Sequence, residues 1–242
     1  MLKIRNMLKI AVIALIIFGG LFAAFLLTAP QSTNIERQET QLDQPLDEAS
    51  LEERADIENK PTLLIGDENA PVKLIEYADF KCTSCNDFHQ KIAPRLKREY
   101  IDSGRAAIEY RTFPFIGPDS GVSARAAYCA QDQGAFESLH DAIYDYVWKT
   151  YYSKGDMAAQ RRDVLTLSTL KELASGKVND IERFDSCINS DDYNRFIDAD
   201  LLLGAEDGIT GTPGFVIGDQ SITGLTNYNT LKTLIDIELS RN

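Results

Sequence analysis

The stretch "VKLIEYADFKCTSCNDFH", residues 72–89, changes its periodicity at a pair of cysteines. Residues 72–80 form a β-branched and aromatic run that is short enough for a strand and follows the turn-forming segment "GDENAP". After Cys82 apolar side chains recur every four positions, as on an amphipathic helix, namely at Phe88, Ile92, Leu96 and Tyr100. The pair therefore lies where a predicted strand gives way to a predicted helix.

A second strand is predicted at residues 106–115, "AAIEYRTFPF", beyond a helix that Pro94 should kink. Strand, helix and strand together predict a right-handed βαβ unit with parallel strands. Segments with helical spacing then fill about residues 119–207. Two short strands joined by a Gly-Asp turn are predicted within residues 212–224, before a closing amphipathic helix. The pattern predicts an α/β fold with an inserted helical subdomain.

The N-terminal segment differs in composition from the rest of the chain. Three basic residues precede an apolar stretch at residues 10–27 that is long enough to cross a bilayer. We expect residues 1–29 to be an uncleaved signal anchor. The apolar stretch is long for a signal peptide, and a small-x-small cleavage motif that ends at Ala29 would need a small residue where Leu27 stands. The positive-inside rule then places the N-terminus in the cytoplasm and the remainder outside, as a single-pass membrane protein.

The composition of the remaining chain indicates one folded domain behind a polar segment. The 242 residues are 44% hydrophobic, which supports one full-sized core with an elaboration, assigned to residues 61–242. Residues 30–60 are acidic and poor in aromatics, so we expect a tether, with a short solvated helix at residues 46–57 as the alternative. The formal net charge of -12 argues against nucleic acid as a partner.

The C-x-x-C pair supplies the candidate chemistry. A bond between Cys82 and Cys85 closes too short a loop to stabilise the fold much, so the pair favours a disulfide that is made and broken. In the first turn of a helix, unpaired N–H groups and the helix dipole stabilise the Cys82 thiolate, the species that attacks disulfides. Cys85, one turn further in, is then the more buried, resolving thiol.

A zinc site is the alternative use of the same stretch. Cys82, Cys85 and His89 lie close in sequence, but no second Cys/His pair supplies a fourth ligand at suitable spacing. His89 either faces the cysteine pair and tunes it or is an exposed helix histidine, and we favour the exposed position. We expect His140 to be structural.

The other two cysteines, Cys129 and Cys187, fall in the predicted helical subdomain. An even number of cysteines outside the membrane segment fits two disulfides. A bond between them would contribute roughly 2 to 4 kcal/mol by constraining the unfolded chain. We expect a structural disulfide; two buried free thiols and a second redox couple are the alternatives.

Two further features support a redox site. Glu76 lies in the middle of the first predicted strand, where a partly buried carboxylate could pass protons to and from Cys85, unless it falls on an exposed face. Thr212 and Pro213 precede a predicted strand, where proline is tolerated because it has no N–H for the ladder. An X-Pro bond can be cis, which at this point would present a backbone edge to a partner chain.

The order of these features resembles the thioredoxin superfamily, and specifically the DsbA-like thiol:disulfide oxidoreductases, over about residues 62–242. The resemblance implies that Cys82 is an exposed nucleophile, that Cys85 resolves the mixed disulfide and that Glu76 is the family's buried acid. It also implies that Pro213 is the cis-proline of the family and that Thr212 packs against the disulfide and pairs with the substrate backbone.

Two positions depart from that family's pattern. The dipeptide between the cysteines is Thr83-Ser84, where the strong bacterial oxidants carry Pro-His, and these residues influence the redox potential. Gly214 follows the proline where relatives commonly carry Thr or Ala, which would loosen the edge that meets the substrate.

The leading functional hypothesis is a membrane-tethered enzyme that oxidises cysteines of exported proteins and is reoxidised by a membrane quinone-linked thiol oxidase, as the resemblance implies. We expect no cofactor, metal or nucleotide, because no Gly-rich phosphate loop or ligand cluster occurs in the sequence. One alternative is a reductase or isomerase of the same fold. Another is a non-catalytic module that binds a partner in the groove around Pro213 and keeps a permanent Cys82–Cys85 bond.

Overall fold

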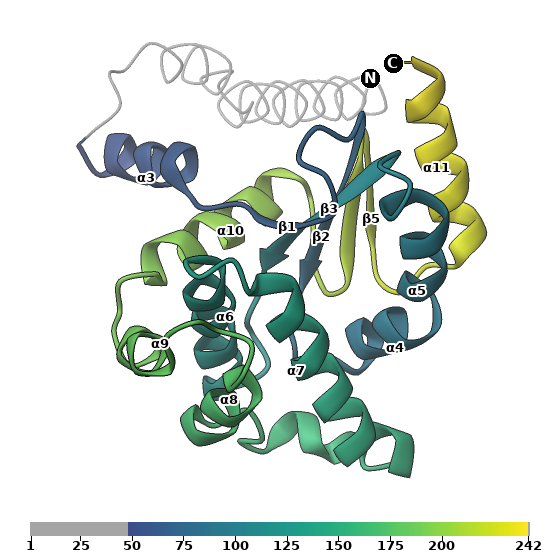
Figure 1. Ribbon diagram of the computed structural model, residues 1–242. Helices are drawn as coiled ribbons and strands as arrows, with labels where there is room; N and C mark the ends of the chain where they lie inside the picture. The colour runs from purple at the N-terminus through teal and green to yellow at the C-terminus, as the bar shows by residue number, and fades with distance from the viewer. Residues whose placement is uncertain (1–47, 242) are drawn as a thin grey trace, which may run out of the picture. The chain divides into compact units, whose positions relative to one another are not determined.

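A computed structural model of the protein describes residues 48–241 (Figure 1). The expected signal anchor at residues 1–29 and the expected tether as far as residue 47 lie outside this range. Among residues 48–241, no helix is both long and apolar enough to cross a bilayer.

The sheet has five strands in the order β1-β3-β2-β4-β5. The strands are β1 (Leu63–Ile65), β2 (Val72–Ala78), β3 (Ala106–Thr112), β4 (Gly214–Ile217) and β5 (Gln220–Thr223). β2 and β3 are parallel, and the other three pairings are antiparallel. The parallel pair and the β4–β5 hairpin lie where the sequence predicts them, whereas the three-residue β1 was not predicted because so short an apolar run has no readable period.

Helices surround this sheet and occupy its long connections (Figure 1). The α-helices are α3 (Glu48–Asn59), α4 (Thr83–Lys91), α5 (Ala93–Leu96), α6 (Pro118–Gln131), α7 (Phe136–Thr150), α8 (Leu167–Ala174), α9 (Ile181–Ile188), α10 (Asn194–Glu206) and α11 (Tyr228–Arg241). Shorter turns are the π-helix η1 (Lys97–Ile101) and the 3₁₀ helices η2 (Tyr152–Lys154) and η3 (Met157–Arg161). Helices α6 to α10 form the inserted helical subdomain between β3 and β4.

The predicted helix after the cysteines is divided near Pro94. α4 ends with its C-cap at Ile92, and α5 begins with Pro94 in its first turn, where a missing N–H costs no helical hydrogen bond. The division leaves α4 as a separate nine-residue helix that carries both cysteines at its start. The chain therefore changes direction just beyond the candidate site.

The polar segment at residues 30–60 is not a tether over its last part. Residues 48–59 form α3, close to the solvated helix that was the alternative, and α3 packs on α10. An ion pair joins Asp56 to Arg195 at 3.5 Å, and the Lys60 Nζ lies 3.0 Å from the buried Asp200 Oδ1. These charge contacts give a polar helix a docking place that its composition alone does not predict.

Strand β2 separates two environments, because successive side chains of a strand point to opposite faces. Glu76 points toward α4, where its Oε1 lies 2.9 Å from the His89 Nε2. Tyr77 points the other way and donates its hydroxyl hydrogen to Asp207 at the end of α10, at 2.6 Å. The sheet is thus covered on both faces, and the α4 face holds the candidate site.

Candidate redox-active site

Cys82 and Cys85 occupy the N-terminus of α4 and carry free thiols. Cys82 is the N-cap residue, with extended backbone at φ -68° and ψ 124°, and its sulfur lies beside the backbone N–H groups of Ser84 and Cys85 at the first turn. Cys85 is fully buried, whereas Cys82 keeps 8% of its surface exposed. Cys82 is more enclosed than the resemblance implied, because the loop that carries Thr212 lies against it.

The surroundings of Cys82 favour its thiolate. A hydrogen bond from the Cys85 thiol is the largest contribution that lowers the pKa of Cys82, to about 6, against the opposing effect of burial. The Thr212 side chain and the backbone N–H groups of Cys85 and Ser84 lower that pKa further. Ser84, with Thr83, forms the first turn of the helix, so the dipeptide between the cysteines acts here through its backbone.

Cys85 has the opposite character. Burial raises the pKa of its thiol well above the ordinary value, and the adjacent Cys82 and the charge of Glu76 act in the same direction. A thiol that holds its proton next to one that releases it gives the pair one attacking and one protonated sulfur. This asymmetry is the arrangement that thiol–disulfide exchange requires.

The loop before β4 closes the site from the other side. The Thr212–Pro213 peptide bond is cis, and the Cys82 Sγ lies 3.5 Å from the Thr212 carbonyl oxygen. The Thr212 hydroxyl oxygen is buried and has no other hydrogen-bond partner within the described residues, which leaves it free to meet the Cys82 sulfur. A Cβ atom on Gly214 would come within 2.5 Å of Ile209, so the packing of Ile209 accounts for the glycine that departs from the family pattern.

Glu76 lies on the buried face of β2, beneath α4. Its Oε2 has no partner within residues 48–241, while its Oε1 meets the His89 Nε2. The favoured expectation that His89 is exposed is therefore wrong: its side chain is only 8% exposed and stacks on Tyr144, with ring centroids 3.9 Å apart. His89 follows Cys85 by one helical turn, and this spacing puts both on the buried face.

A buried polar network before the cysteines was not predicted from the sequence. Asp79 accepts hydrogen bonds from the backbone N–H groups of Lys81, Phe115 and Ile116 and from the Ser120 hydroxyl. Burial raises the pKa of Asp79 in spite of these donors. The network ties the residues before Cys82 to the start of α6.

Lys81 extends this network into the helical subdomain. It is 1% exposed and forms an ion pair with Asp119, whose Oδ2 in turn accepts the Val164 and Leu165 backbone N–H groups at 2.8 and 3.0 Å. In the sequence, the signal for this contact is a lysine directly before the C-x-x-C. Its ion-pair partner Asp119 lies in a different element, α6, so the sequence alone does not reveal the pair. The subdomain therefore fixes the position of the segment that presents Cys82.

The second cysteine pair forms a disulfide between α6 and α9. Cys129 and Cys187 are joined across 58 positions of sequence, with their Cα atoms 5.9 Å apart. No group of three or more Cys, His, Asp or Glu side chains within the described part of the chain is arranged to hold a metal ion. In particular, His89 contacts Glu76 where the zinc alternative needs it to bind metal with the cysteines.

Comparisons with known proteins agree with this fold and site. The family model described as Thioredoxin matches residues 58–237. The probable disulfide bond formation protein D of Bacillus cereus is 32% identical over 179 residues, which are 73% of this chain and 78% of that protein. The chain therefore belongs to the thioredoxin family.

Solved structures of low sequence identity share the fold of this chain. The oxidised BdbD of Bacillus subtilis superposes with a TM-score of 0.65 at 22% identity and covers 74% of this chain and 93% of that one. The DsbA of Chlamydia trachomatis gives a TM-score of 0.60 at 23% identity, over 74% and 91% of the two chains. The family match, the Bacillus cereus relative and the cysteine pair at the start of α4 together identify the protein as a DsbA-like thiol:disulfide oxidoreductase.

Proposed function

We propose that the protein introduces disulfide bonds into exported proteins. In the oxidised pair Cys82 is the sulfur that a substrate thiolate attacks, and in the reduced pair Cys82 is the nucleophilic thiolate. The observation that carries the proposal is the lowered pKa of Cys82, about 6, at the N-cap of α4. A stabilised thiolate favours the reduced pair, and a pair that favours its reduced form is a strong oxidant of other thiols. The name of the Bacillus cereus relative, a probable disulfide bond formation protein, supports the same direction.

The exchange proceeds in two balanced steps. A substrate thiolate attacks the Cys82 sulfur of the oxidised pair, the Cys82–Cys85 bond breaks, and Cys85 leaves as a thiolate and takes up a proton. A second substrate thiolate then attacks the substrate sulfur of the mixed disulfide, and Cys82 leaves as a thiolate. The substrate loses two electrons and the pair gains them. Glu76, buried beneath α4, supplies the proton that Cys85 takes up.

Thr212 and Pro213 would hold the substrate. Their loop lies against Cys82, so an extended peptide that pairs with its backbone edge would place a cysteine beside the reactive sulfur. Thr83 and Ser84 flank the same sulfur on the helix side. Recognition through backbone groups would make the site tolerant of substrate sequence.

Location and recycling complete the proposal. The apolar stretch at residues 10–27 would anchor the chain in the membrane with the folded domain outside the cytoplasm. The reduced pair would pass its two electrons to a membrane quinone-linked thiol oxidase. A protease that is added to intact cells or spheroplasts should digest the folded domain, and complete protection would contradict this topology.

The decisive measurement is the redox equilibrium of the purified full-length protein with glutathione, with the thiol state of Cys82 and Cys85 followed by mass. A potential of about -120 to -180 mV would support the oxidase. A potential near -270 mV, as in thioredoxin, would make the protein a reductase and overturn the proposal.

A further inference from the structure

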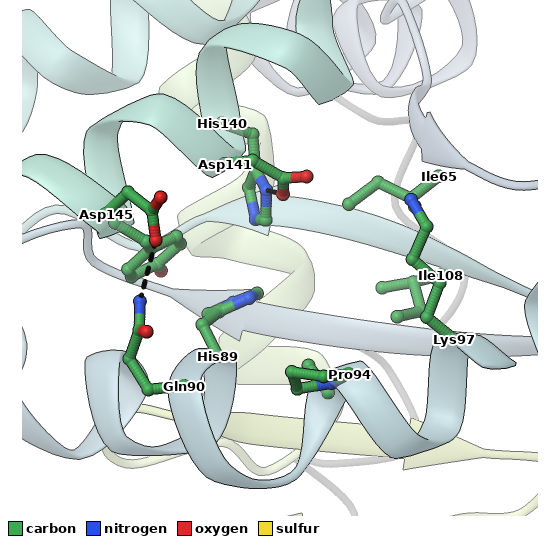
Figure 2. Close-up of a pocket in the computed structure, with 11 residues that line it drawn as sticks. Ile65, His89, Gln90, Pro94, Lys97, Ile108, His140, Asp141 and Asp145 are labelled. Carbon is green, nitrogen blue, oxygen red and sulfur yellow. Dashed lines mark hydrogen bonds and ion pairs between the residues drawn. The ribbon is translucent and has the colours of Figure 1, made fainter.

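A cavity of about 310 Å³ lies beside α4, on the side of the Glu76–His89 contact. His89, Gln90 and Pro94 line it from α4 and α5, and His140 and Asp145 line it from α7. Figure 2 shows the side chains of His89 and His140 projecting into the same space from opposite walls. The redox chemistry described above uses none of these cavity-lining residues.

Glu76 is fully buried, and within the described residues the hydrogen-bond contact of its side chain is with His89. If Glu76 gives a proton to Cys85, another proton must reach it from solvent before the next exchange. Its Oε1 contacts the His89 Nε2, and the His89 side chain is both 8% exposed and part of the cavity wall. His89 therefore stands between the buried carboxyl group and the open space.

We propose that His89 is a proton relay that connects Glu76, and through it Cys85, with solvent by way of this cavity. The proposal rests on the proposed exchange chemistry of the Cys82–Cys85 pair, and it goes beyond that chemistry by assigning the path of the proton. Histidine suits the role, because its two ring nitrogens can receive a proton on one side and release one on the other near neutral pH.

The proton balance follows from the two nitrogens. When the Cys85 thiolate leaves, it takes the proton of the Glu76 carboxyl group, and the His89 Nε2–H then donates its proton to the Glu76 carboxylate. The Nδ1 of the same ring takes a proton from water in the cavity, so the ring ends neutral. Formation of the Cys82–Cys85 disulfide runs the same path in reverse. No electron passes through the ring, and no further reactant is needed.

The opposite wall is suited to the same path. His140 shares a hydrogen bond between its Nδ1 and the Asp141 Oδ1 at 2.9 Å, and its buried Nε2 has no partner in the described part of the chain. Burial lowers the pKa of His140, so the ring is neutral and its Nε2 is an acceptor that faces His89, with ring centroids 4.6 Å apart. The cavity has room for water, which can bridge polar groups of this kind.

The charges around His89 come from three elements. Glu76 lies on β2, and Lys97 on η1 is paired with Glu137 and lines the cavity. The titratable groups of α7 that line the same cavity are His140, Asp141, Tyr144 and Asp145. Charged groups of both signs therefore face the relay.

The test compares single-turnover oxidation of a dithiol peptide by the wild-type protein and by His89→Ala and His89→Gln variants. Acid quenching, alkylation and mass measurement would follow the loss of the Cys82–Cys85 bond between about pH 6 and about pH 8, the range in which histidine titrates. Gln90→Ala is the matched control, because Gln90 lines the same cavity from the same helix and contacts Asp145, not Glu76.

We expect both His89 variants to be slower by about tenfold or more, a smaller effect than the roughly hundredfold of a direct general acid or base. The deficit should grow with pH, because solvent then supplies fewer protons, and added imidazole should restore the rate of His89→Ala by occupying the emptied volume. Gln90→Ala should match the wild type without imidazole.

Two outcomes would overturn the relay. One is a His89→Gln rate within about twofold of the wild type at every pH, below the smallest effect of general acid–base catalysis. The other is a slow His89→Ala that imidazole does not accelerate, which would make His89 a packing residue. His89→Gln keeps a polar side chain opposite Glu76, so it tests the relay if His89→Ala fails to fold. Exchange in either direction needs this proton, so a reductase potential would overturn the proposed function and leave the relay standing.

Discussion

Cys82 and Cys85 stand within one turn at the start of α4, whereas Cys129 and Cys187 join α6 to α9 across 58 positions of sequence. The first pair carries free thiols and the second forms a disulfide. The Cys82 thiol meets helix N–H groups, a neighbouring thiol and Thr212, and these contacts lower its pKa to about 6. Cys129 lies on α6, and its side chain is almost fully buried in the core of the helical subdomain.

The comparison shows that the position of a cysteine pair in the fold determines whether the pair has a redox role or a structural role. A short loop gains little from closure, so the bond at the start of α4 can open at small cost to stability. A long loop gains more, so the bond in the helical subdomain should persist. The predictions below separate the two pairs by activity and by stability.

The largest expected effect comes from Cys82→Ser. We expect dithiol oxidation to fall at least about 10³-fold, because a hydroxyl group cannot form the mixed disulfide and loss of a nucleophile removes most of catalysis. Peptide oxidation by the full-length variant would measure it. Below about pH 6, where the Cys82 thiol is protonated in both the folded and the unfolded protein, the free energy of unfolding should stay close to that of the reduced wild type. Retained oxidation would contradict the redox assignment, and peptide binding that survives the substitution, with no oxidation by the wild type, would favour the binding-module alternative.

The complementary change is Cys129→Ala with Cys187→Ala. Removing this bond frees a 58-position loop in the unfolded chain, so the free energy of unfolding should fall by roughly 2 to 4 kcal/mol. Urea unfolding of the oxidised protein would measure the loss. Oxidation by Cys82 and Cys85 should continue below the unfolding transition. Loss of oxidation with unchanged stability would instead indicate a second redox couple that relays electrons.

The sequence predicted those parts of the molecule that depend on local pattern. The βαβ unit, the hairpin at residues 212–224 and the helical subdomain follow from periodicity and turn residues. The C-x-x-C indicated the site because helix N-termini favour thiolates wherever they occur. Local rules were sufficient for these features because every residue concerned acts through its near neighbours.

The parts that could not be predicted depend on partners from distant segments. From the sequence alone Lys81 would be assigned to the surface, because its partner Asp119 lies on α6. Asp79 would be assigned to the surface for the same reason, because its hydrogen-bond donors lie at residues 115–120. His89 did carry a local signal, since it follows Cys85 by one helical turn. What the sequence did not show was that α7 covers this face of α4, which turns an apparently exposed histidine inward.

A pH titration should sharpen the contrast within the first pair. Alkylation of reduced Cys82 should reach half its maximal rate near pH 6, the pKa that its surroundings produce, and fall about tenfold per pH unit below it because only the thiolate reacts. Mass measurement would show which cysteine is labelled. Cys85, whose pKa burial raises well above its ordinary value, should stay unlabelled. A midpoint near the ordinary cysteine value of about 8.5 would contradict the stabilised thiolate.

The same titration makes a prediction for the stability of the reduced protein, with a definite sign. The folded state lowers the pKa of Cys82 below its unfolded value, so the stabilisation is fully present above about pH 8.5 and is lost as the pH falls through about 6. Urea unfolding of the reduced wild type should therefore show stability rising across this window, relative to Cys82→Ser. A difference that does not change with pH would exclude this linkage.

The smallest expected effect is that of Thr212→Val, which removes the buried hydroxyl group and keeps the shape of the side chain. The hydroxyl contributes to the low pKa of Cys82 and lacks any other partner in the described region, so its loss should raise that pKa. A hydrogen bond of about 1 kcal/mol corresponds to a roughly fivefold slower alkylation at a pH below the midpoint. Thr223→Val is the matched control, because Thr223 lies in β5 and its hydroxyl accepts the Thr210 N–H. If both variants alkylate equally fast, the thiolate owes its stability to α4 and Cys85 alone, and the loop before β4 serves only to hold the substrate.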